Sequence, residues 1–486
     1  MTTGEMQAIF PPMNTQNLPL IWKSLYQVAP AQLAKMSEVR GVVSAFNANI
    51  DAVIKVKPDL LQRWISLAGV EASSLLLDGI RAIQSPVDVL RGFVQCFKNG
   101  TAMEWLVQEE SAFQWMREHV GYDRLQMGGQ GGIIANVLAV CGAKQVFVHC
   151  ASLPEQQAKL FLDLPNLLSA QPDAQAAPAA KIHREKDLPL IHWILEFDKG
   201  DVLELAGQSF TCPKSNRFIA TWDPENFRLA IDPAFDLLIQ KSSGVETVLL
   251  AGYQMLSHPL LDGTSGTDRV DASMRIVGTW RKAHPGLCVH FEFASTQDKT
   301  IRKYLLDHVA PWADSIGLNE QELIDVLDVA GETEMAAKLR ADLHGASLLH
   351  ALEWLYRRVQ AKRIQLHFFG MYLTLQAKNH PTAPATTRNG MILAATIAAA
   401  KAGTGSIEKH ENLMWAHGRA VSDVSLQELQ AIAGELGAAG KTLLDTGIAS
   451  MKDVDVIAVP TILIEKPITL VGMGDTISSL SLIGAK

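Results

Sequence analysis

Paired cysteines, an excess of basic residues and long apolar runs are all missing from this sequence. Its five cysteines are scattered and never spaced as C-x-x-C, which argues against a disulfide framework and against a cysteine-ligated zinc site. The chain has 43 Lys and Arg against 51 Asp and Glu, and its formal net charge is -8. This balance argues against nucleic acid or an anionic membrane surface as a partner.

Signals for export or membrane insertion are also missing. The longest uncharged apolar run, Met391 to Ala400, is too short to cross a bilayer. The first residues, MTTGEMQAIFPPMN, contain neither the basic region nor the continuous apolar region that is typical of a secretory signal. We therefore expect a soluble, cytoplasmic protein whose cysteines are reduced.

The length and the order of segments predict an α/β fold with an insertion. A chain of 486 residues, 48% of them apolar, exceeds the usual single core. From residue 235 onward strand-like and helix-like segments alternate, which predicts a mostly parallel sheet with helices on both faces. Residues 181–221 form short alternating runs and predict an antiparallel β insertion. Residues 59–119 have a helical pattern, and the Ala- and Pro-rich residues 166–180 predict a linker.

A stretch near the C-terminus predicts an anion-binding turn. Residues 468–471 (ITLV) predict a strand, which the turn Gly472-Met473-Gly474 would connect to a helix. Glycines let the backbone approach a ligand, and the free amides at the start of a helix bind anions such as phosphate. Asp475 beside these amides could take a proton from an attacking hydroxyl. Alternatively, Asp475 is only the N-cap of the helix.

Polar side chains alternate with apolar ones in residues 41–56, which read as a strand that could leave one lobe and enter another. Asn47, Asn49 and Asp51 recur at every second position and therefore share one strand face. Three hydrogen-bonding groups on one face could bind the hydroxyls of a sugar. The alternative is an edge strand with a solvated polar face.

The glycine cluster GGQGGIIAN, residues 128–136, opens a predicted helix. As a dinucleotide fingerprint it is weak, because it does not follow a clear strand in a βαβ unit close to the N-terminus and the acidic partner about 20 residues further on is missing. It could bring backbone amides and Gln130 to a small polar ligand, or merely allow close helix packing. A nicotinamide-dependent oxidoreductase built on this loop is the alternative function from another class.

Phosphoryl transfer also needs cationic groups that neutralise the developing charge. Arg217, in the predicted β insertion, could bind phosphate oxygens or be a solvated surface residue. Glu292 shares a strand face with His290 and is a possible magnesium ligand. Asn319 and Glu322 stand three residues apart and could orient a magnesium-bound water, although the same spacing fits a capping box.

Together these stretches resemble the ADP-dependent glucokinase and phosphofructokinase family, a branch of the ribokinase-like sugar kinases. The resemblance covers nearly the whole chain and rests on NANID, GGQGGIIAN, IHWILEF, NRFI, HFEFAS, GLNEQEL and VGMGDTISS, in the order found in the family. It implies a ribokinase-like three-layer α/β/α large domain and a smaller α+β lid domain over the sugar. The large domain would comprise residues 1–48, 123–180 and 235–486, and the lid residues 49–122 and 181–234.

The resemblance also implies roles for individual residues. Asp475 matches the general base and Arg217 the arginine that binds the transferred phosphate. The anion hole would be formed by the amides of Gly472, Met473 and Gly474. The residues that match sugar-binding positions are Asn49, Asp51, Glu104, Gly129, Gln130 and His192. The residues that match magnesium-organising positions, mostly through water, are Glu292, Glu322, Asn319 and Asp475.

The activity that the resemblance implies is transfer of the β-phosphate of ADP to a sugar hydroxyl, with release of AMP and with Mg²⁺ as the cofactor. Glu104 and His192 look like positions of the glucokinase branch and favour glucose. Fructose 6-phosphate, or both sugars, is the alternative, because the basic residues Lys181, Arg184 and Lys186 could bind a sugar phosphate. The expected partners are the sugar and ADP, with no nucleic acid and no membrane, and the expected state is a monomer or a small homo-oligomer.

Overall fold

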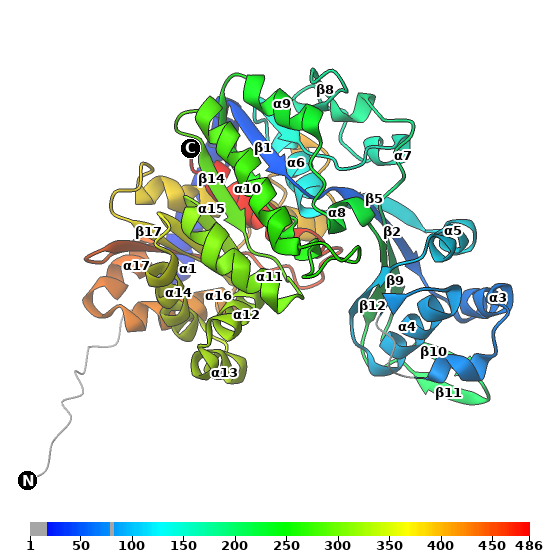
Figure 1. Cartoon of the computed structure of the whole chain (residues 1–486). Coiled ribbons are helices and arrows are strands. Elements are labelled where there is room, and N and C mark those ends of the chain that lie inside the picture. The colour runs from blue at the N-terminus through cyan, green and yellow to red at the C-terminus, as the bar shows by residue number, and fades with distance from the viewer. Residues whose placement is uncertain (1–16, 78–81) are drawn as a thin grey trace, which may run out of the picture. The chain divides into compact units, whose positions relative to one another are not determined.

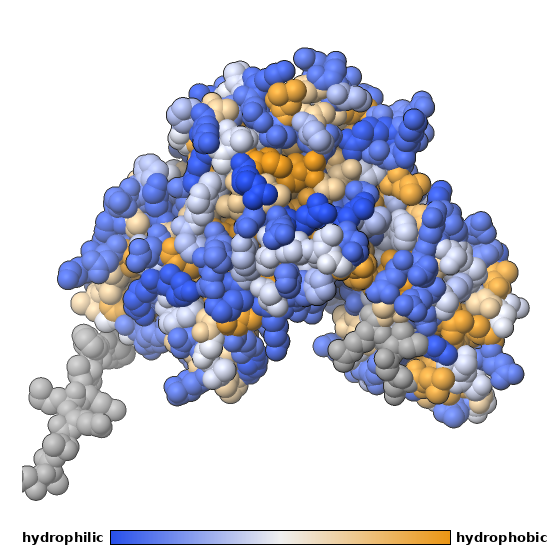
Figure 2. Space-filling model, viewed as in Figure 1, coloured by the Kyte–Doolittle hydropathy of each residue, from blue (hydrophilic) through white to orange (hydrophobic). Residues whose placement is uncertain are grey.

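The computed structural model describes residues 17–77 and 82–486, and its chain forms two compact units (Figure 1). The first unit comprises residues 17–39, 290–295 and 305–486, and the second comprises residues 40–289 and 296–304. Residues 1–14, on which the expected lack of a secretory signal rests, lie outside the described residues. No helix among the described ones is long and apolar enough to span a membrane, and the face seen in Figure 2 is mostly hydrophilic with smaller hydrophobic patches.

The first unit contains a mixed sheet between helices. Its strands are hydrogen-bonded in the order β18 (Ile448–Ser450), β19 (Val454–Pro460), β17 (Met371–Ala377), β16 (Arg363–Phe368), β15 (Ser315–Asn319) and β14 (Cys288–Glu292), of which residues 290–292 belong to this unit. Strands β14, β15 and β16 are parallel, whereas β17 pairs antiparallel with both β16 and β19. Strand β16 is buried along its whole length, as expected for a sheet that helices cover on both faces. Its main helices are α12 (Glu320–Ala330), α14 (Gly345–Val359), α15 (Pro384–Thr404), α16 (Asp423–Glu435), α17 (Gly440–Thr446) and α18 (Met473–Ile483).

The second unit contains a parallel sheet with an antiparallel edge. Its strand order is β13 (Val245–Leu250), β1 (Gly41–Ala45), β6 (Gln145–Val148), β7 (Leu167–Ala170) and β8 (Ala176–Pro178). Only the β7–β8 pair is antiparallel in this part of the unit. The predicted linker over residues 166–180 is therefore wrong. Leu167 is buried in β7, and the proline-containing β8 is the edge strand, where the missing amide of proline costs no ladder hydrogen bond.

A second sheet of this unit has the order β3 (Ala82–Ile83), β4 (Met103–Val107), β12 (Asn216–Trp222), β9 (Ile191–Phe197), β2 (Asn49–Lys55) and β5 (Arg124–Gly128). The predicted antiparallel insertion is confirmed, because β9 and β12 pair antiparallel and β10 (Val202–Leu205) forms a hairpin with β11 (Gln208–Thr211). Residues 41–56 form two strands in two different sheets, as the sequence suggests. Five of the six strands come from residues 49–122 and 181–234, but a separate lid domain with these bounds stays a prediction.

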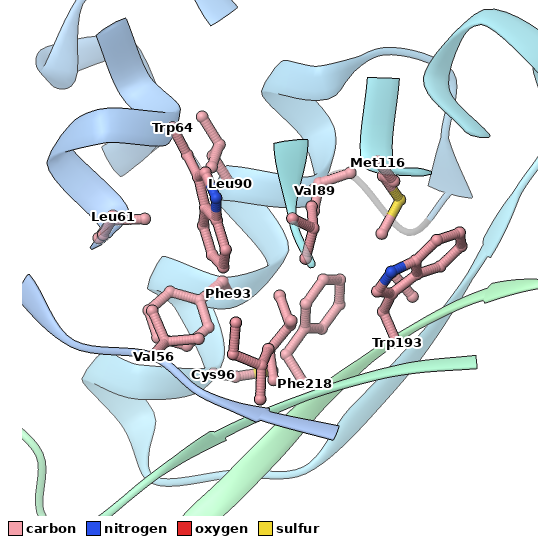
Figure 3. Packing of buried hydrophobic residues seen from close by; sticks show 14 of the residues in the cluster. Val56, Leu61, Trp64, Val89, Leu90, Phe93, Cys96, Met116, Trp193 and Phe218 are labelled. Atoms are coloured by element: carbon pink, nitrogen blue, oxygen red, sulfur yellow. The ribbon is translucent and has the colours of Figure 1, made fainter. Parts of the chain in front are cut away.

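One face of this second sheet carries an apolar core. Strands β9 and β12 alternate buried apolar and more exposed residues, which is the pattern of a sheet with one face buried. Helices α3 (Pro58–Ala68), α4 (Pro86–Asn99) and α5 (Glu110–His119) cover this face, and Trp64, Phe93 and Trp193 lie in the core with Phe218 (Figure 3). Helix α4 approaches β12 at Gly92, where an added Cβ would lie 2.3 Å from the Phe218 ring. The other face of the sheet is thereby left for polar side chains.

Phe218→Ala is expected to destabilise the second unit by about 3–5 kcal/mol, because the substitution leaves a cavity beneath helix α4. Urea unfolding followed by the fluorescence of the core tryptophans measures this change. Tyr122→Ala, at an exposed position, is the control and should change the free energy of unfolding by less than about 0.5 kcal/mol. Equal unfolding midpoints for the two variants would contradict the prediction.

Candidate active site

Helix α18 of the first unit begins at the predicted anion-binding turn. Gly472 is the N-cap, with a left-handed φ of 62°, and Asp475 lies in the first turn of the helix. Asp475 is therefore not the N-cap, and its side chain is half-buried in the first turn of the helix. The first amides of a helix have no acceptor within it, so those of Met473 and Gly474 can bind an anion at this end.

The predicted strand over residues 468–471 is wrong. These residues form no strand, and Ile468 and Leu470 are 70% and 68% exposed. The apolar and β-branched composition favours a strand, but this preference has no effect where no neighbouring strand supplies a ladder. The predicted helix is confirmed, but it begins at Met473, so that of the predicted turn only Gly472 precedes the helix.

Glu292 lies at the end of β14, close to helix α18. Its Oε2 atom accepts a hydrogen bond from Ser478 of α18 and lies 3.0 Å from Nε2 of His290, whose Nδ1 is 2.9 Å from Oγ of Ser315. Burial raises the pKa of Glu292 well above its usual value, and the charges of Glu322 and Asp475 raise it further. A Cβ at Gly317 would come within 2.0 Å of Glu292 Oε2, so glycine on the adjacent strand leaves room for the carboxylate.

Asn319 and Glu322 form the capping box of helix α12. The backbone N–H of Glu322 donates to Oδ1 of Asn319 at 2.9 Å, and the backbone N–H of Asn319 donates to Oε2 of Glu322 at 2.8 Å. Burial raises the pKa of Glu322 to about 8; the hydrogen bond from Asn319 opposes the shift, and the charge of Asp475 adds to it. The capping-box alternative is thus confirmed for this pair, and Glu322 also interacts electrostatically with Asp475.

The carboxylates of Glu292, Glu322 and Asp475 are suited to a cation held through water. Their negative charges raise the pKa values of Glu292 and Glu322, and a divalent cation nearby would relieve this repulsion. Within residues 17–77 and 82–486, no three His, Cys, Asp or Glu side chains are grouped to bind a metal directly. A cation at these carboxylates would have to be held through water, and Mg²⁺ is an ion that usually keeps several of its waters.

A group of five side chains, which we call the polar cluster, lies at the second sheet of the second unit. Its members are Asp51, Glu104, His192, Thr221 and Asp223. The strand register sets Asp51 beside His192 and His192 beside Thr221. Thr221 Oγ1 donates to Oε1 of Glu104 at 2.7 Å, and His192 Nε2 is 3.0 Å from Oδ2 of the fully buried Asp223. The structure thus brings together three predicted sugar-binding residues, Asp51, Glu104 and His192, with two that the sequence did not indicate.

His192 is a cation at neutral pH. Burial alone lowers its pKa, but the hydrogen bond and charge of Asp223 and the charges of Glu104 and Asp51 raise the pKa to about 9. Burial raises the pKa of Asp51, while His192 and Asn49 oppose the shift. An imidazolium among carboxylates provides both donors and acceptors, as the hydroxyl groups of a sugar require.

The pairing of His192 predicts a pH-dependent contribution to stability. The pKa is about 9 in the folded protein against an ordinary value of 6.5, so this contribution is fully present below about pH 6.5 and is lost as the pH rises through about 9. Thermal unfolding of the wild type and of His192→Gln at pH 6.5 and 9.5 measures it. We expect the stability difference between the two proteins to shrink by on the order of 2–3 kcal/mol; a difference independent of pH would contradict the assignment.

The glycine loop after β5 lies against residues Asn47 and Asn49. Gly129 has a φ of 74°, and a Cβ there would be 2.7 Å from Oδ1 of Asn49. Asn49 Nδ2 donates to Asp51 Oδ1 at 2.9 Å, whereas the buried Oδ1 atoms of Asn47 and Asn49 have no hydrogen-bond partner in the described structure. Gln130 accepts a hydrogen bond from the Gly252 amide at 3.1 Å, so its carboxamide oxygen serves the fold.

A strand does precede this loop, because β5 leads directly into it. However, β5 belongs to the second sheet and pairs antiparallel with β2, whereas β6, which follows helix α6 (Gln130–Val140), belongs to the other sheet. A dinucleotide-binding βαβ unit needs two parallel strands in one sheet. The loop therefore does not form the nicotinamide site of the alternative function.

Arg217 lies on β12, on the strand face that carries Thr221. Arg217 pairs with Glu196 of β9, and Thr221 pairs with His192 of the same strand. Glu196 and His192 are two positions apart along that face of the sheet. Four residues of strand separate Arg217 from Thr221, which is about 13 Å. Its side chain is exposed. The structure thus places Arg217 and the polar cluster on one face of one sheet, while its contact with a phosphate stays a prediction.

An α/β fold, a helix N-terminus with a carboxylate in its first turn and a cluster of polar side chains that suits hydroxyl groups are each expected of a sugar kinase. The conserved region of ADP-specific phosphofructokinases and glucokinases matches residues 40–484. The chain belongs to this family and is an ADP-dependent phosphotransferase that acts on a sugar. The nicotinamide-dependent alternative is therefore not supported.

Relatives of both specificities resemble the chain to the same degree. It is 29% identical to an ADP-specific phosphofructokinase of Methanosarcina acetivorans over 90% of this chain and 91% of that protein. It is 30% identical to an ADP-dependent glucose/glucosamine kinase of Pyrococcus abyssi over 95% and 98%. A solved ADP-dependent kinase in complex with fructose-6-phosphate and ADPβS superimposes with a TM-score of 0.80 at 25% identity, covering 97% of this chain and 98% of that one. The α/β fold is thus confirmed. The names of these relatives do not decide which sugar is the acceptor, so the preference has to be argued from the side chains of this protein.

Proposed function

We propose that this enzyme transfers the β-phosphate of ADP to glucose in preference to fructose 6-phosphate, with Asp475 as the general base. The observation that carries the preference is the charge of the polar cluster. It contains three carboxylates, Asp51, Glu104 and Asp223, and one cation, His192. Neutral hydroxyls can bind to such a group, whereas a phosphate on the sugar would be repelled by the excess negative charge.

The basic residues that could bind a sugar phosphate support the same preference. Arg184 forms ion pairs with Asp187 and Asp232 and donates to the carbonyl oxygens of Cys150 and Ala151, so its guanidinium is used within the fold. Lys181 forms an ion pair with Asp163. Two of the three basic residues considered for fructose 6-phosphate are therefore paired with carboxylates of the protein.

In the proposed reaction, Asp475 accepts the proton of the sugar hydroxyl while the amides of Gly472, Met473 and Gly474 bind the transferred phosphoryl group. Asp475 suits this role because it stands in the first turn of α18, next to the amides that would bind the phosphoryl group. Arg217 binds the phosphoryl oxygens. Mg²⁺, which Glu292, Glu322, Asn319 and Asp475 would hold through waters, would supply positive charge that neutralises the phosphates.

The predicted lid, residues 49–122 and 181–234, would exclude water from the site when the sugar binds. Exclusion of water matters because an accessible site would hydrolyse ADP instead of phosphorylating the sugar. We take the enzyme to be cytoplasmic, in keeping with the few scattered cysteines of its sequence, and to be a monomer or a small homo-oligomer.

An AMP-release assay tests the proposed function directly. The purified protein is given glucose or fructose 6-phosphate, each with ADP and then with ATP, in the presence of Mg²⁺. We expect the highest kcat/KM for glucose with ADP. A higher kcat/KM for fructose 6-phosphate would reject the glucose preference, and comparable values would identify a bifunctional enzyme.

A further inference from the structure

Helix α15 brings a lysine to the anion-binding end of helix α18. Helices α15 and α18 pack against each other, and Lys401 lies in the last turn of α15. Its Nζ donates to the carbonyl oxygen of Gly472 at 3.1 Å and to Oγ1 of Thr476 at 3.2 Å. A lysine at a helix C-terminus commonly binds the last carbonyls of its own helix, whereas the contacts of Lys401 are with the first turn of another helix.

The carbonyl of Gly472 is held by three donors. Besides Lys401, it accepts hydrogen bonds from the backbone N–H of Thr476 at 3.1 Å and from Oγ1 of Thr476 at 2.8 Å. A trans peptide group directs its C=O and its N–H in opposite directions. Fixing the Gly472 carbonyl therefore fixes the N–H of Met473, which points out of the helix end where the phosphoryl group would bind.

The charge of Lys401 acts at the same place. Burial lowers the pKa of Lys401 to about 8, and the charge of Asp475 opposes this shift, so the ammonium is mostly protonated at neutral pH. A half-buried cation beside the first turn of α18 adds to the positive potential of the helix end.

We propose that Lys401 is a positioning residue for phosphoryl transfer, which holds the Gly472 peptide so that the Met473 amide faces the transferred phosphoryl group. This inference rests on the proposed anion hole at Gly472–Gly474. It does not depend on which sugar is the acceptor.

The test compares Lys401→Met, Lys401→Gln and Lys401→Arg with the wild type in the AMP-release assay. Loss of a charged hydrogen bond that orients the anion hole should lower kcat roughly 10- to 100-fold in Lys401→Met. The KM for the sugar should stay within about twofold, because the hydrogen bonds of Lys401 are with Gly472 and Thr476, which are not among the proposed sugar-binding residues. Lys401→Arg should retain most of the activity. Lys401→Gln keeps a donor without the charge and should resemble Lys401→Met.

Arg388→Met is the matched control. Arg388 is another half-buried cation of helix α15, and its NH1 group donates to the carbonyl of Thr446 at 2.9 Å, remote in sequence from the Gly472 turn. We expect its kcat to stay within about twofold of the wild type. A wild-type kcat in Lys401→Met would overturn the inference alone, as would an equal loss of kcat in Arg388→Met and Lys401→Met. A folded wild type that releases no AMP from ADP with either sugar would overturn the proposed function, and this inference with it.

Discussion

Asp475→Asn is expected to lower kcat by about 10²- to 10⁴-fold, the range for loss of a general base. The asparagine has nearly the same shape, so helix α18 and its free amides should remain in place. ADP should bind as tightly as before or slightly more tightly, since the substitution removes a negative charge next to the phosphate. The fall should therefore be seen in kcat and not in the dissociation constant of ADP.

Steady-state kinetics and calorimetric titration with ADP separate these two quantities. Asp423→Asn is the matched control, because Asp423 is an exposed carboxylate in the first turn of another helix, α16. It shares the helix-dipole interaction of Asp475 but lies apart from the Gly472 turn in sequence, and its kcat should not change. Near-normal turnover in Asp475→Asn would reject Asp475 as the base, whatever the result with ADP binding.

The start of helix α18 could be predicted from the sequence because its signals are local. Gly472 and the helical pattern after it lie within one short stretch, and the structure confirms a helix that begins directly after Gly472. The strand assigned to residues 468–471 fails for the complementary reason. A strand requires a partner from elsewhere in the chain, and the composition of a segment does not contain that information.

The polar cluster shows the same limit more clearly. The resemblance to the family indicated Glu104, yet its strand β4 lies within residues 59–119, which have a helical pattern in the sequence. Thr221 binds Glu104 only because β12 pairs with β4, and Asp223 pairs with His192 across 31 positions of the chain. These contacts depend on which strands are neighbours and on the register between them. The hydrophobic pattern of a strand indicates which of its faces is buried, but it does not identify the neighbouring strand.

Lys401 was missed for a related reason. It ends an alanine-rich helix in which a lysine normally indicates a solvated last turn. Its acceptor Gly472 lies 71 positions later, and only the packing of α15 on α18 brings the two together. Residues that act through another residue, such as Lys401 and Asp223, are thus the ones that the sequence did not reveal, because their chemistry depends on a partner and not on a motif.

Arg217→Ala is expected to lower kcat/KM. The fall should correspond to a loss of about 2–4 kcal/mol of transition-state stabilisation, the range for loss of one donor to a developing charge. Arg217 is exposed on β12, so its removal should cost little folding stability and the kinetic effect can be measured without correction for unfolded protein. Arg217→Lys should recover only part of the loss, because an ammonium cannot form the two parallel hydrogen bonds that a guanidinium makes with phosphate oxygens.

Arg124→Ala provides the control for the charge of this sheet. Arg124 is an exposed arginine on β5, and its NH2 group lies 3.6 Å from Oε1 of Glu196, the residue that pairs with Arg217. If Arg217 acts only through the general potential of the sheet, both substitutions should lower kcat/KM to a similar, small extent that disappears at high salt. If it binds the transferred phosphoryl group, the loss should be confined to Arg217→Ala and persist at high ionic strength, since a desolvated contact is screened much less. An unchanged kcat/KM in Arg217→Ala would exclude both roles.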